Sequence, residues 1–530
     1  MSSARTRKKK TRGQIWFLGA GPGDPELLTL RGVAALSDAE VLVVDADVAT
    51  DSLRGRCRDD VEVHRVDGDD HAGNGKLVVR EARAGRQVVR LVGGDPVLFG
   101  PFANEAAACA KAGLPYEVLP GVSAAIAVPA YAGVPLTTAK QREVRVVSAA
   151  DETEVSALGD STATVVVLDV EAAVAETAAA LVEGGRDEST PVSVTWEGTT
   201  TRQRTVVSTL GGVAADTKDS DTEAPAVLVV GDVVAQRERL SWFETKPLFG
   251  WRVLIPRTRE QAAPLTERLR RYGAVPEEVP TISVEPPRTP QQMERAVKGL
   301  VNGSYEWLVF TSANAVRAVR EKFTEYGLDA RAFAGVKIAA IGEQTAESIE
   351  AFGIRPDLVP TGQQSSEGLL EEFPPYDSVF DPINKVLLPR ADIATETLVA
   401  GLERLGWEAE DVTAYRTVRA APPPAETREA IKSGGFDAVL FTSSSTVRNL
   451  VGIAGKPHAT TIVGVIGPAT AETAEEFGLR VDVTASSPSA LQLADEVAEF
   501  AATRRDEMLE AGQAFRRPSE MRRGARRRAK

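Results

Sequence analysis

The sequence predicts an α/β protein with mostly parallel sheets, and three observations support this. Short apolar runs rich in Val, Ile and Leu alternate with helix-length segments along the chain. Runs that are apolar throughout are typical of parallel strands covered by helices on both faces. The chain has 530 residues, too many for one hydrophobic core, and its second half repeats its own motifs. We therefore expect several α/β units.

The expected strands fall into two groups along the chain. Those of the first half are IWFLGA (15–20), VLVVDA (41–46), VVRLVGG (88–94), TVVVLDV (164–170) and VLVVGDVV (227–234). Those of the second half are VLIPR (253–257), WLVFTS (307–312), IAAIG (338–342), VLLPR (386–390), AVLFTS (438–443) and VGVIG (463–467). Helix-length segments separate most of these runs, which predicts repeated strand–helix units.

The second half contains an internal duplication. VLIPR at 253–257 recurs as VLLPR at 386–390, and FTSANAV at 310–316 recurs as FTSSSTV at 441–447. The spacing between the copies is far longer than a solenoid repeat, so it predicts two related α/β lobes. Between the two halves, the segment 237–250 is too apolar for a flexible spacer, and we expect it to pack as a strap.

Composition points to a soluble globular protein in a reducing compartment. Hydrophobic residues make up 43% and charged residues 26% of the chain, which excludes wholesale disorder and a coiled coil. The only cysteines are Cys57 and Cys109, too few for a disulfide framework. No stretch has the features of a signal peptide or a membrane span. We expect a cytoplasmic protein with no membrane partner.

Charge is unevenly distributed. Residues 1–12 carry six Lys or Arg and no acid, and residues 501–530 carry ten against four Asp or Glu, although the whole chain is at −13. The acidic region between these ends would repel duplex nucleic acid, so we expect no specific nucleic-acid partner. The ends, 1–13 and 501–530, are interpreted as solvated basic tails, with contact to RNA or anionic lipid as the alternative.

A glycine-rich loop, GAGPGDPELLT, follows the first expected strand. A dinucleotide-binding loop would have a third glycine where Asp24 stands, and Pro22 has no amide hydrogen to offer a phosphate. A Rossmann dehydrogenase is therefore not expected.

The first half also contains VVRLVGGDPVLFG, LPGVSAAIAVPAYAGVPLT, EGTTTRQR and APAVLVVGDVV, in this order after the glycine loop. Together these motifs resemble the tetrapyrrole methylases, specifically uroporphyrinogen-III C-methyltransferase, over residues 14–236. The resemblance implies a two-lobed α/β domain, usually a homodimer, that uses S-adenosylmethionine to methylate C2 and C7 of uroporphyrinogen III, giving precorrin-2. A sulfonium donor needs alignment with a nucleophilic carbon rather than a metal.

The resemblance implies site residues in this half. Those that would line the cofactor pocket are Pro22, Gly93, Gly94, Asp95, Ser123, Ala124, Leu168 and Ala226. Asp45 matches a family aspartate near the substrate and is a candidate to take up a proton, while a helix N-cap or a solvent position explains it equally well.

The sequence departs from the family pattern at VDADV (44–48), LTTA (136–139) and LDV (168–170). Val44, Ala46 and Thr138 stand where the family usually has Tyr, Arg and His. These changes remove groups that would meet substrate carboxylates, so methylation of uroporphyrinogen by this half stays open.

Four strands of the second half end in small polar turns that open a helix: FTSANAV, AIGEQTAE, FTSSSTV and VIGPATAE. The free N–H groups of a first helical turn are ready anion sites, although capping alone explains any single turn. Two lobes with such turns fit a ligand that carries several carboxylates, because amides and arginines act at short range despite unfavourable net charge.

These turns, with VLIPR, VLLPR and AYRTV, resemble uroporphyrinogen-III synthase over residues 251–500. The resemblance implies two flavodoxin-like lobes, the first from 251–284 with 418–500 and the second from 285–417. It implies cyclisation of hydroxymethylbilane with inversion of ring D, without a cofactor. Tyr415 matches a family tyrosine that would donate a hydrogen bond to the departing hydroxyl, and a tyrosine that merely packs is the alternative. Candidate substrate-binding residues are Arg257, Thr311, Ser312, Arg390, Thr442, Ser443 and Thr470.

The sequence thus predicts a bifunctional enzyme with a methylase domain (14–236), a linker (237–250) and a synthase domain (251–500). One alternative keeps only the synthase active, with the first half as a binding or scaffolding domain. Another is a non-catalytic two-lobed receptor for a small polyanion. No metal site is expected, because His64, His71 and His458 show no metal-ligand spacing.

Overall fold

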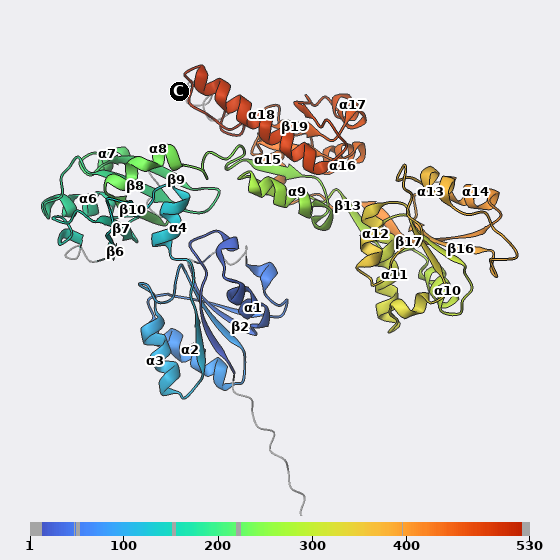
Figure 1. The fold of residues 1–530 in the computed structure, drawn as a ribbon, viewed down its shortest axis with the longest axis horizontal. Coiled ribbons are helices and arrows are strands. Elements are labelled where there is room, and N and C mark those ends of the chain that lie inside the picture. The colour runs from blue at the N-terminus through green and yellow to red at the C-terminus, as the bar shows by residue number, and fades with distance from the viewer. Residues whose placement is uncertain are drawn as a thin grey trace, which may run out of the picture. The chain divides into compact units, whose positions relative to one another are not determined.

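The computed structural model describes residues 13–46, 48, 53–150, 155–218, 224–394 and 396–521, without the side chains of 259–261. The chain divides into two compact units. Unit 1 runs to Trp251 and includes Leu269–Val275, and unit 2 contains Arg252–Arg268 and the chain from Pro276 onward. Each unit contains two five-stranded sheets (Figure 1), so the α/β class is confirmed. The expected tail 1–13 lies outside the described residues except for Gly13.

The first sheet of unit 1 is parallel, with the strand order β3-β2-β4-β1-β5. Its strands are β1 (Ile15–Gly19), β2 (Val41–Asp45), β3 (Glu62–Val66), β4 (Val88–Val92) and β5 (Tyr116–Leu119). Its helices are η1 (Pro25–Leu27), α1 (Leu30–Asp38), η2 (Arg54–Arg56), α2 (His71–Arg83) and α3 (Phe102–Lys111). Helix α1 packs on one face, and α2 and α3 pack on the other. Every residue of β2 and β4 is buried, which explains their nearly continuous apolar sequences.

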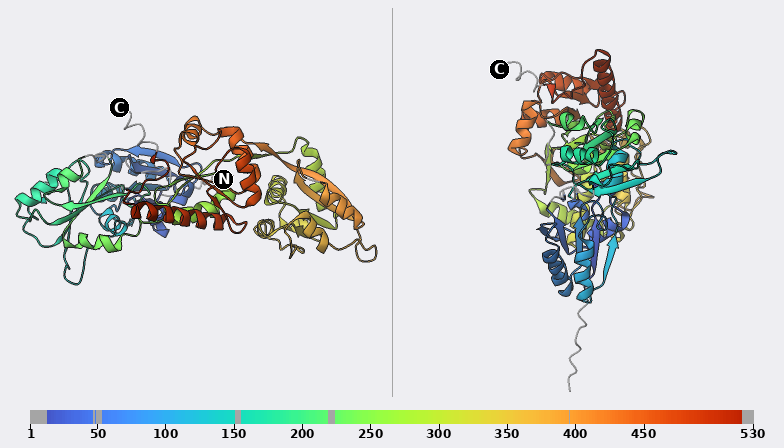
Figure 2. Two further views of the ribbon diagram at one scale, coloured as in Figure 1. Left: turned by 90° about the horizontal axis from the view of Figure 1, so that it is seen from above. Right: turned by 90° about the vertical axis from the view of Figure 1, so that its left-hand side faces the viewer.

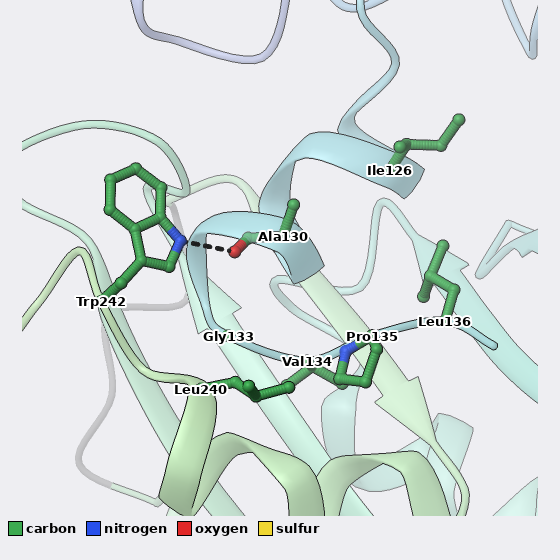
Figure 3. Close-up of a pocket in the computed structure, with 8 residues that line it drawn as sticks. All are labelled: Ile126, Ala130, Gly133, Val134, Pro135, Leu136, Leu240 and Trp242. Atoms are coloured by element: carbon green, nitrogen blue, oxygen red, sulfur yellow. Dashed lines mark hydrogen bonds between the residues drawn. The ribbon is translucent and has the colours of Figure 1, made fainter. Parts of the chain in front are cut away.

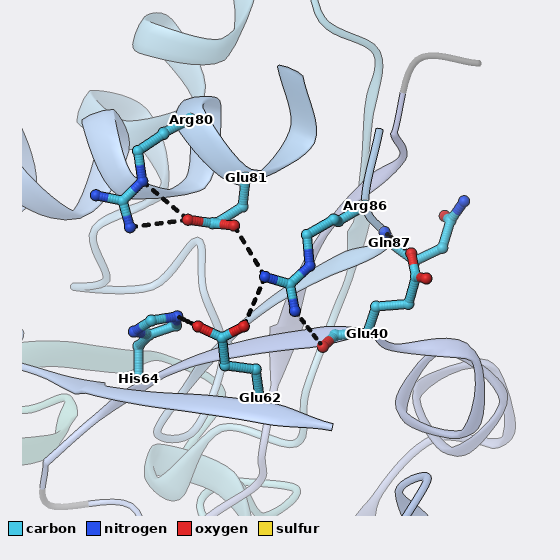
Figure 4. A network of polar contacts seen from close by, with 7 residues as sticks. All are labelled: Glu40, Glu62, His64, Arg80, Glu81, Arg86 and Gln87. Atoms are coloured by element: carbon cyan, nitrogen blue, oxygen red, sulfur yellow. Dashed lines mark hydrogen bonds and ion pairs between the residues drawn. The ribbon is translucent and has the colours of Figure 1, made fainter. Parts of the chain in front are cut away.

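A network of charged side chains fastens the amino ends of these strands (Figure 4). Arg86 Nη1 donates to Glu62 Oε2 at 2.6 Å and to Glu81 Oε2 at 3.1 Å, and Arg86 Nη2 donates to the Glu40 carbonyl at 3.2 Å. The Gln87 N–H donates to the Glu40 carboxylate at 2.8 Å. The network lies at the edge of the sheet where the strands begin. The loops that carry the candidate site lie at the opposite edge, where the strands end.

The second sheet of unit 1 is mixed, unlike the mostly parallel sheets that the sequence predicts. Its strands are β6 (Val144–Ser148), β7 (Thr164–Leu168), β8 (Pro191–Trp196), β9 (Arg204–Thr209) and β10 (Ala226–Val230), in the order β6-β7-β10-β8-β9. Only β6 and β7 pair in parallel. Its helices are α6 (Val174–Glu183), α7 (Val213–Asp216) and η3 (Asp232–Gln236). Helix α4 (Ala124–Tyr131) leads from the first sheet and packs on β7 and β10.

The apolar segment 237–250, which begins with α8 (Arg237–Leu240), packs within unit 1. Phe243 and Leu248 are buried, and the rings of Phe243 and Tyr131 lie 4.7 Å apart. The Trp242 indole N–H donates to the Ala130 carbonyl at 3.0 Å. The expectation that this segment packs as a strap is confirmed.

Unit 2 contains two further sheets. The first combines strands from the beginning of the unit with strands from its C-terminal part. The first sheet, β12-β11-β18-β19-β20, is built from β11 (Arg252–Ile255), β12 (Val275–Glu278), β18 (Ala438–Phe441), β19 (Ile462–Val465) and β20 (Val483–Thr484). Its helices are α9 (Arg259–Arg271), α15 (Ala425–Ser433), α16 (Ser444–Ala454), α17 (Pro468–Glu476) and α18 (Ala490–Glu510).

The second sheet, β13-β17-β16-β14-β15, is built from β13 (Ile282–Glu285), β14 (Trp307–Phe310), β15 (Lys337–Ala340), β16 (Lys385–Ala391) and β17 (Glu408–Arg419). Its helices are α10 (Pro290–Val301), α11 (Ala313–Glu325), η4 (Ala330–Phe333), α12 (Glu343–Glu350), α13 (Ser366–Glu372) and α14 (Thr397–Arg404). Strand β13 pairs antiparallel with β17, whereas β17 with β16, β16 with β14, and β14 with β15 pair in parallel. The element series β14-α11-β15-α12 recurs as β18-α16-β19-α17, so the duplication is confirmed.

The region expected as a C-terminal tail is partly folded. Helix α18 continues to Glu510 and packs against β19 and β20 (Figure 2), with Ala501 fully buried. Farther on, the Ser519 N–H donates to the buried carboxylate of Asp437 at 2.8 Å. The basic composition of 501–530 hid this, because α18 ends at Glu510 and only Arg504 and Arg505 of the basic residues lie in it. Over the described residues, no helix has the length and apolarity to cross a membrane.

Three glycines at the carboxyl edge of the first sheet pack backbone against backbone. A Cβ on Gly121 would lie 2.0 Å from the Gly94 carbonyl oxygen and 2.7 Å from Gly19 Cα. A Cβ on Gly19 would lie 2.4 Å from that same oxygen. Only glycine fits these positions, so the loops after β1, β4 and β5 are held together by direct main-chain contact.

We expect Gly121→Ala to lower the thermal unfolding midpoint measurably, because overpacking costs about 1–3 kcal/mol and each kcal/mol shifts Tm by about 2–4 °C in a domain of this size. Gly55→Ala is the control, since no atom lies within 4 Å of its Cβ position. Differential scanning calorimetry measures both. A Gly121→Ala midpoint equal to that of the wild type would contradict the close packing.

Candidate functional site

In unit 1, the glycine loops after β1 and β4 form one side of the candidate site. The Gly94 N–H donates to the Gly21 carbonyl at 3.0 Å, and the Gly21 N–H donates back at 3.2 Å. Gly21 has a φ of 77° and Gly94 has a φ of 58°, and these positive values explain why glycine occupies both positions. Asp95 Oδ2 accepts from the Gly121 N–H at 2.9 Å. The loop that carries Pro22 therefore lies beside Gly94 and Asp95.

Helix α4 connects this edge to the second sheet. Ser123 caps the helix, because its Oγ accepts from the Ala125 N–H at 3.2 Å. A Cβ on Gly94 would lie 3.8 Å from Ala124 N, and Ala124 packs in the same apolar cluster as Leu168. The structure therefore brings Gly94, Ala124 and Leu168, far apart in sequence, into one contiguous set.

The remaining predicted cofactor residues lie at the same edges. Leu168 ends β7, and Ala226 begins the antiparallel neighbour β10, opposite Trp196 at the end of β8. At Gly93 the space beside Cα is open, and the nearest atom to a Cβ would be Val48 Cγ2 at 3.9 Å. A ligand can approach the main chain closely there, which fits the adenosyl cofactor that the resemblance implies.

Hydrogen bonds link the glycine loop to the second sheet and to the strap. The Asp24 N–H donates to Thr199 Oγ1 at 3.0 Å, and the Thr199 N–H donates to Gln203 Oε1 at 2.8 Å. Gln203 Nε2 donates to Glu244 Oε1 in the strap at 2.8 Å, and Tyr131 Oη donates to Asp24 Oδ2 at 3.1 Å. Burial and the Asp24 charge raise the pKa of Tyr131 to about 12. Sequence reasoning missed this chain, because no motif spacing marks it.

Asp45 is neither an N-cap nor a solvent residue, because it ends β2 in a buried ion pair. Arg90 Nη2 lies 2.6 Å from Asp45 Oδ1, and Arg90 also forms a two-pronged pair with Glu105. Arg90 and Glu105 are 0% exposed and Asp45 is 8% exposed. Sequence reasoning missed Arg90 and Glu105, although an arginine inside the apolar run VVRLV was a visible signal.

The residues that depart from the family pattern have different surroundings. Val44 is fully buried and packs in the core beneath α1, so its side chain does not reach the edge. Ala46 is exposed just after β2. Thr138 Oγ1 accepts from the N–H groups of Lys140 and Gln141 within its own turn. Of the three changes, only the one at Ala46 removes a side chain from an open position beside Asp45.

A separate apolar pocket of about 400 Å³ lies beside α4 and the strap (Figure 3). Its lining residues are Ile126, Ala130, Gly133, Val134, Pro135, Leu136, Leu240 and Trp242. None of the predicted cofactor residues lines this pocket, and its lining offers no charged group. We therefore place the candidate site at the strand edges and not in this pocket.

In unit 2, all four expected strand-to-helix turns are present. Ser312 begins α11 and Ser443 begins α16, and each hydroxyl accepts from the N–H three residues on, at 3.2 and 3.3 Å. Gly342 and Gly467 precede α12 and α17. Gln364 covers the Gly342 turn, since its Oε1 would lie 2.8 Å from a Cβ there, whereas nothing lies within 4 Å of one on Gly467. The two lobes thus differ in how open their turns are.

Tyr415 is brought to the start of α11 by a β-bulge. Its hydroxyl lies 2.9 Å from Ser312 Oγ, and Thr311 precedes that cap. The pairing of β16 with β17 is regular up to Arg390 opposite Thr413 and then shifts, so that Ala391 faces Tyr415. Regular alternation would place Tyr415 on the opposite face from Ala414, yet both pack in the core beneath α11.

The predicted substrate-binding residues of unit 2 are not equally available. Arg257 follows β11, next to the Thr442–Ser443 turn after β18. Its N–H donates to the Ile255 carbonyl at 2.9 Å, whereas its side chain has no hydrogen bond or ion pair within the described part of the chain. Burial lowers the pKa of Arg257, which an incoming anion would reverse. Arg390, by contrast, is buried and paired with Asp411. Thr470 is buried inside α17 and offers no side chain to a ligand.

Two family profiles match the chain. The one described as Tetrapyrrole (Corrin/Porphyrin) Methylases matches residues 14–214. The one described as Uroporphyrinogen-III synthase HemD matches residues 263–495. The boundary between the matches includes the strap.

One known protein aligns along most of the chain, and others align with its first half. The chain is 29% identical over 498 residues to Porphyrin biosynthesis protein HemD of Ruminiclostridium josui, covering 90% of this chain and 96% of that protein. It is 36% identical over 238 residues to Uroporphyrinogen-III C-methyltransferase of Methanocaldococcus jannaschii, covering 42% of this chain and 97% of that protein. A structure of the Thermus thermophilus Uroporphyrin-III C-methyl transferase complexed with S-adenyl homocysteine aligns with a TM-score of 0.38 and 32% identity, over 42% of this chain and 99% of that one.

The duplication provides a matched test of the contact between Tyr415 and Ser312. Ser312→Ala and Ser443→Ala each remove a helix cap worth about 1 kcal/mol. Ser312→Ala also leaves the nearly buried Tyr415 hydroxyl without its partner, which adds about 1 kcal/mol or more. We expect the larger loss of stability in Ser312→Ala, measured by thermal unfolding. The Ser443 hydroxyl also lies 2.9 Å from the Ser445 hydroxyl, but that contact is exposed and water can replace it. Equal losses would therefore contradict a significant bond between Ser312 and Tyr415.

Proposed function

Because the chain belongs to the tetrapyrrole methylase family in its first half and to the uroporphyrinogen-III synthase family in its second, we propose that it is a bifunctional enzyme. The synthase half cyclises hydroxymethylbilane to uroporphyrinogen III with inversion of ring D. The methylase half then methylates uroporphyrinogen III at C2 and C7 to give precorrin-2. The observation that carries the proposal is that each half gathers its matched polar and glycine-rich residues mainly in the loops that follow parallel strands.

In the synthase half, the residues have separate roles. Arg257 and the amides after β18 and β19 bind substrate carboxylates, with Thr442 and Ser443 as hydroxyl donors. Thr311 does the same after β14. The Tyr415 phenol donates a hydrogen bond to the departing hydroxyl of hydroxymethylbilane, and Ser312 holds the phenol in place. Arg390 positions β17 through Asp411 and does not bind substrate.

In the methylase half, S-adenosylmethionine, when bound, supplies an electrophilic methyl group on sulfur. The residues that would hold it are Pro22, Gly93, Gly94, Asp95, Ser123, Ala124, Leu168 and Ala226. The open main chain at Gly93 lets the cofactor lie close, and α4 fixes the distance between the two edges. Asp45 accepts the proton that the methylated substrate loses. The synthase half uses no cofactor.

We further expect the methylase half to form a homodimer. The loop after β4 exposes three consecutive large apolar side chains, Val97 at 61%, Leu98 at 40% and Phe99 at 54%. Adjacent exposed apolar side chains are typical of surfaces that bind another chain.

A single assay tests the two activities. Purified protein is incubated with hydroxymethylbilane, with and without S-adenosylmethionine, and the oxidised porphyrins are separated. We expect the type III isomer without cofactor, and a mass increase of two methyl groups with it. Formation of the type I isomer alone would refute the synthase activity, and type III without any mass increase would refute the methylase activity.

Tyr415→Phe tests the role of the phenol. We expect the rate of cyclisation to fall at least tenfold, because general-acid assistance is typically worth that much or more, while the thermal midpoint changes little. Tyr305→Phe is the matched control: Tyr305 lies in the same core and donates to Glu410 at 2.9 Å, but it is not at the strand edge. An unchanged cyclisation rate in Tyr415→Phe would remove this residue from the mechanism.

A further inference from the structure

A buried cluster of charged residues lies behind Asp45 in the first sheet of unit 1. Arg90 is in the middle of β4, on the face covered by α2 and α3, and is fully buried among apolar side chains. Glu105 comes from α3 and Asp45 from the end of β2. A buried guanidinium is stable only when its donors are satisfied, so its partners must stay in place.

Arg90 bonds to its two carboxylates unequally. Its Nε donates to Glu105 Oε2 at 2.8 Å and its Nη2 donates to Glu105 Oε1 at 3.0 Å, a two-pronged pair. Asp45 meets Arg90 through one oxygen, with Oδ1 at 2.6 Å from Nη2. Arg90 Nη1 donates to the Leu91 carbonyl at 3.0 Å. The pair between Arg90 and Glu105 is therefore complete without Asp45.

The two carboxylates also differ in access. Glu105 is sealed in the core, whereas Asp45 lies at the end of its strand with 8% of its surface exposed. Gly68 faces the Asp45 carboxyl group, and a Cβ there would lie 3.4 Å from Asp45 Cγ. Asp45 is thus the member of the cluster that a proton from outside can reach.

Two carboxylates around one guanidinium leave an excess negative charge in a buried place. In agreement with this, burial raises the pKa of Glu105, Arg90 opposes the rise, and the Asp45 charge adds to it. Among the described residues, the other charged or titratable groups near the cluster are Arg65, His71 and Cys109. Arg65 on β3 donates from Nη1 to the Ala46 carbonyl at 3.2 Å, beside Asp45. His71 on α2 acts on Glu105, and burial and Glu105 raise the pKa of Cys109 on α3 to about 11. Cys109 is therefore uncharged at neutral pH.

We propose that Glu105 is a positioning residue that, through Arg90, sets the proton affinity of Asp45 for the methyl-transfer step. Methyl transfer would break the bond between the methyl group and the sulfonium sulfur, which leaves as a neutral thioether, and form the bond to the pyrrole carbon. The substrate would thereby gain a positive charge that it loses by releasing a proton. Asp45 takes that proton, and the cluster passes from one excess negative charge to a neutral Arg90–Glu105 pair. Without the charge of Glu105, the same proton uptake would leave an unbalanced buried cation. The inference rests on the proposed function of the methylase half.

Glu105→Gln keeps the size of the side chain and removes its charge. We expect Asp45 to become a weaker base. The apparent pKa on the acidic side of the pH–rate profile of methyl transfer then falls by about one unit, and the plateau rate falls about tenfold. Binding of S-adenosylmethionine, measured by calorimetry, stays within about twofold, because Glu105 lies away from the glycine loops. Glu105→Asp keeps the charge, so we expect it to restore the wild-type pH dependence at least in part.

Glu81→Gln is the matched control. Glu81 is a buried carboxylate in the same lobe that also pairs with an arginine, but it lies at the opposite edge of the sheet (Figure 4). We expect its pH profile to match the wild type. A shift of the same size in Glu81→Gln would show a general effect of buried charge and would overturn the assignment to Glu105.

A second measurement does not depend on turnover. Infrared titration of the free protein with labelled aspartate follows the Asp45 carboxyl band, which Asp45→Asn identifies. We expect this band to titrate at lower pH in Glu105→Gln, and an unchanged titration overturns the inference whatever the kinetics show. If the wild type does not methylate uroporphyrinogen III while the band shifts as expected, the proposed function fails and the coupling of Glu105 to Asp45 stands.

Discussion

Parallel pairing of neighbouring strands is the constraint on which the candidate sites depend. When adjacent strands run in the same direction, the loops that follow them meet at one edge of the sheet. In unit 1 this places the loops after β1, β4 and β5 within main-chain contact, as the positions of Gly19, Gly94 and Gly121 show. In unit 2 it places the turns after β14 and β15, and after β18 and β19, side by side. Residues far apart in sequence become neighbours without any special contact.

Buried charge imposes a second constraint, because each buried ion must be paired where it lies. Arg90 and Glu105 satisfy each other inside a layer of apolar side chains, and this fixes where Asp45 can point. In unit 2 the buried Arg390 pairs with Asp411, whose side chain is 40% exposed. Arg90 and Arg390 therefore hold neighbouring elements together through these ion pairs. Arg257 has no such partner in the described part of the chain, so its side chain is the one suited to an external anion.

The strap shows that the connection between the halves also has a structural role in unit 1. Glu244 accepts from Gln203, which in turn holds Thr199 against the glycine loop at Asp24. The first half is therefore completed by residues beyond its last strand. This explains why a segment between two family matches is rich in aromatic residues rather than in Gly and Ser.

The sequence by itself determined the α/β class, the duplicated lobes, the four polar turns and the two family resemblances, because apolar period, glycine position and motif order are local properties of the chain. Only the tertiary structure decided which candidate side chains are accessible. Arg390 and Thr470 have the right chemistry but are paired or buried, while Glu105 and Ser312 gain their importance from partners far away in sequence. The bulge that turns Tyr415 toward α11 depends on the pairing of β16 with β17, and the mixed second sheet depends on how β10 enters it. Strand pairing and burial are set by contacts between distant segments, which no local pattern encodes.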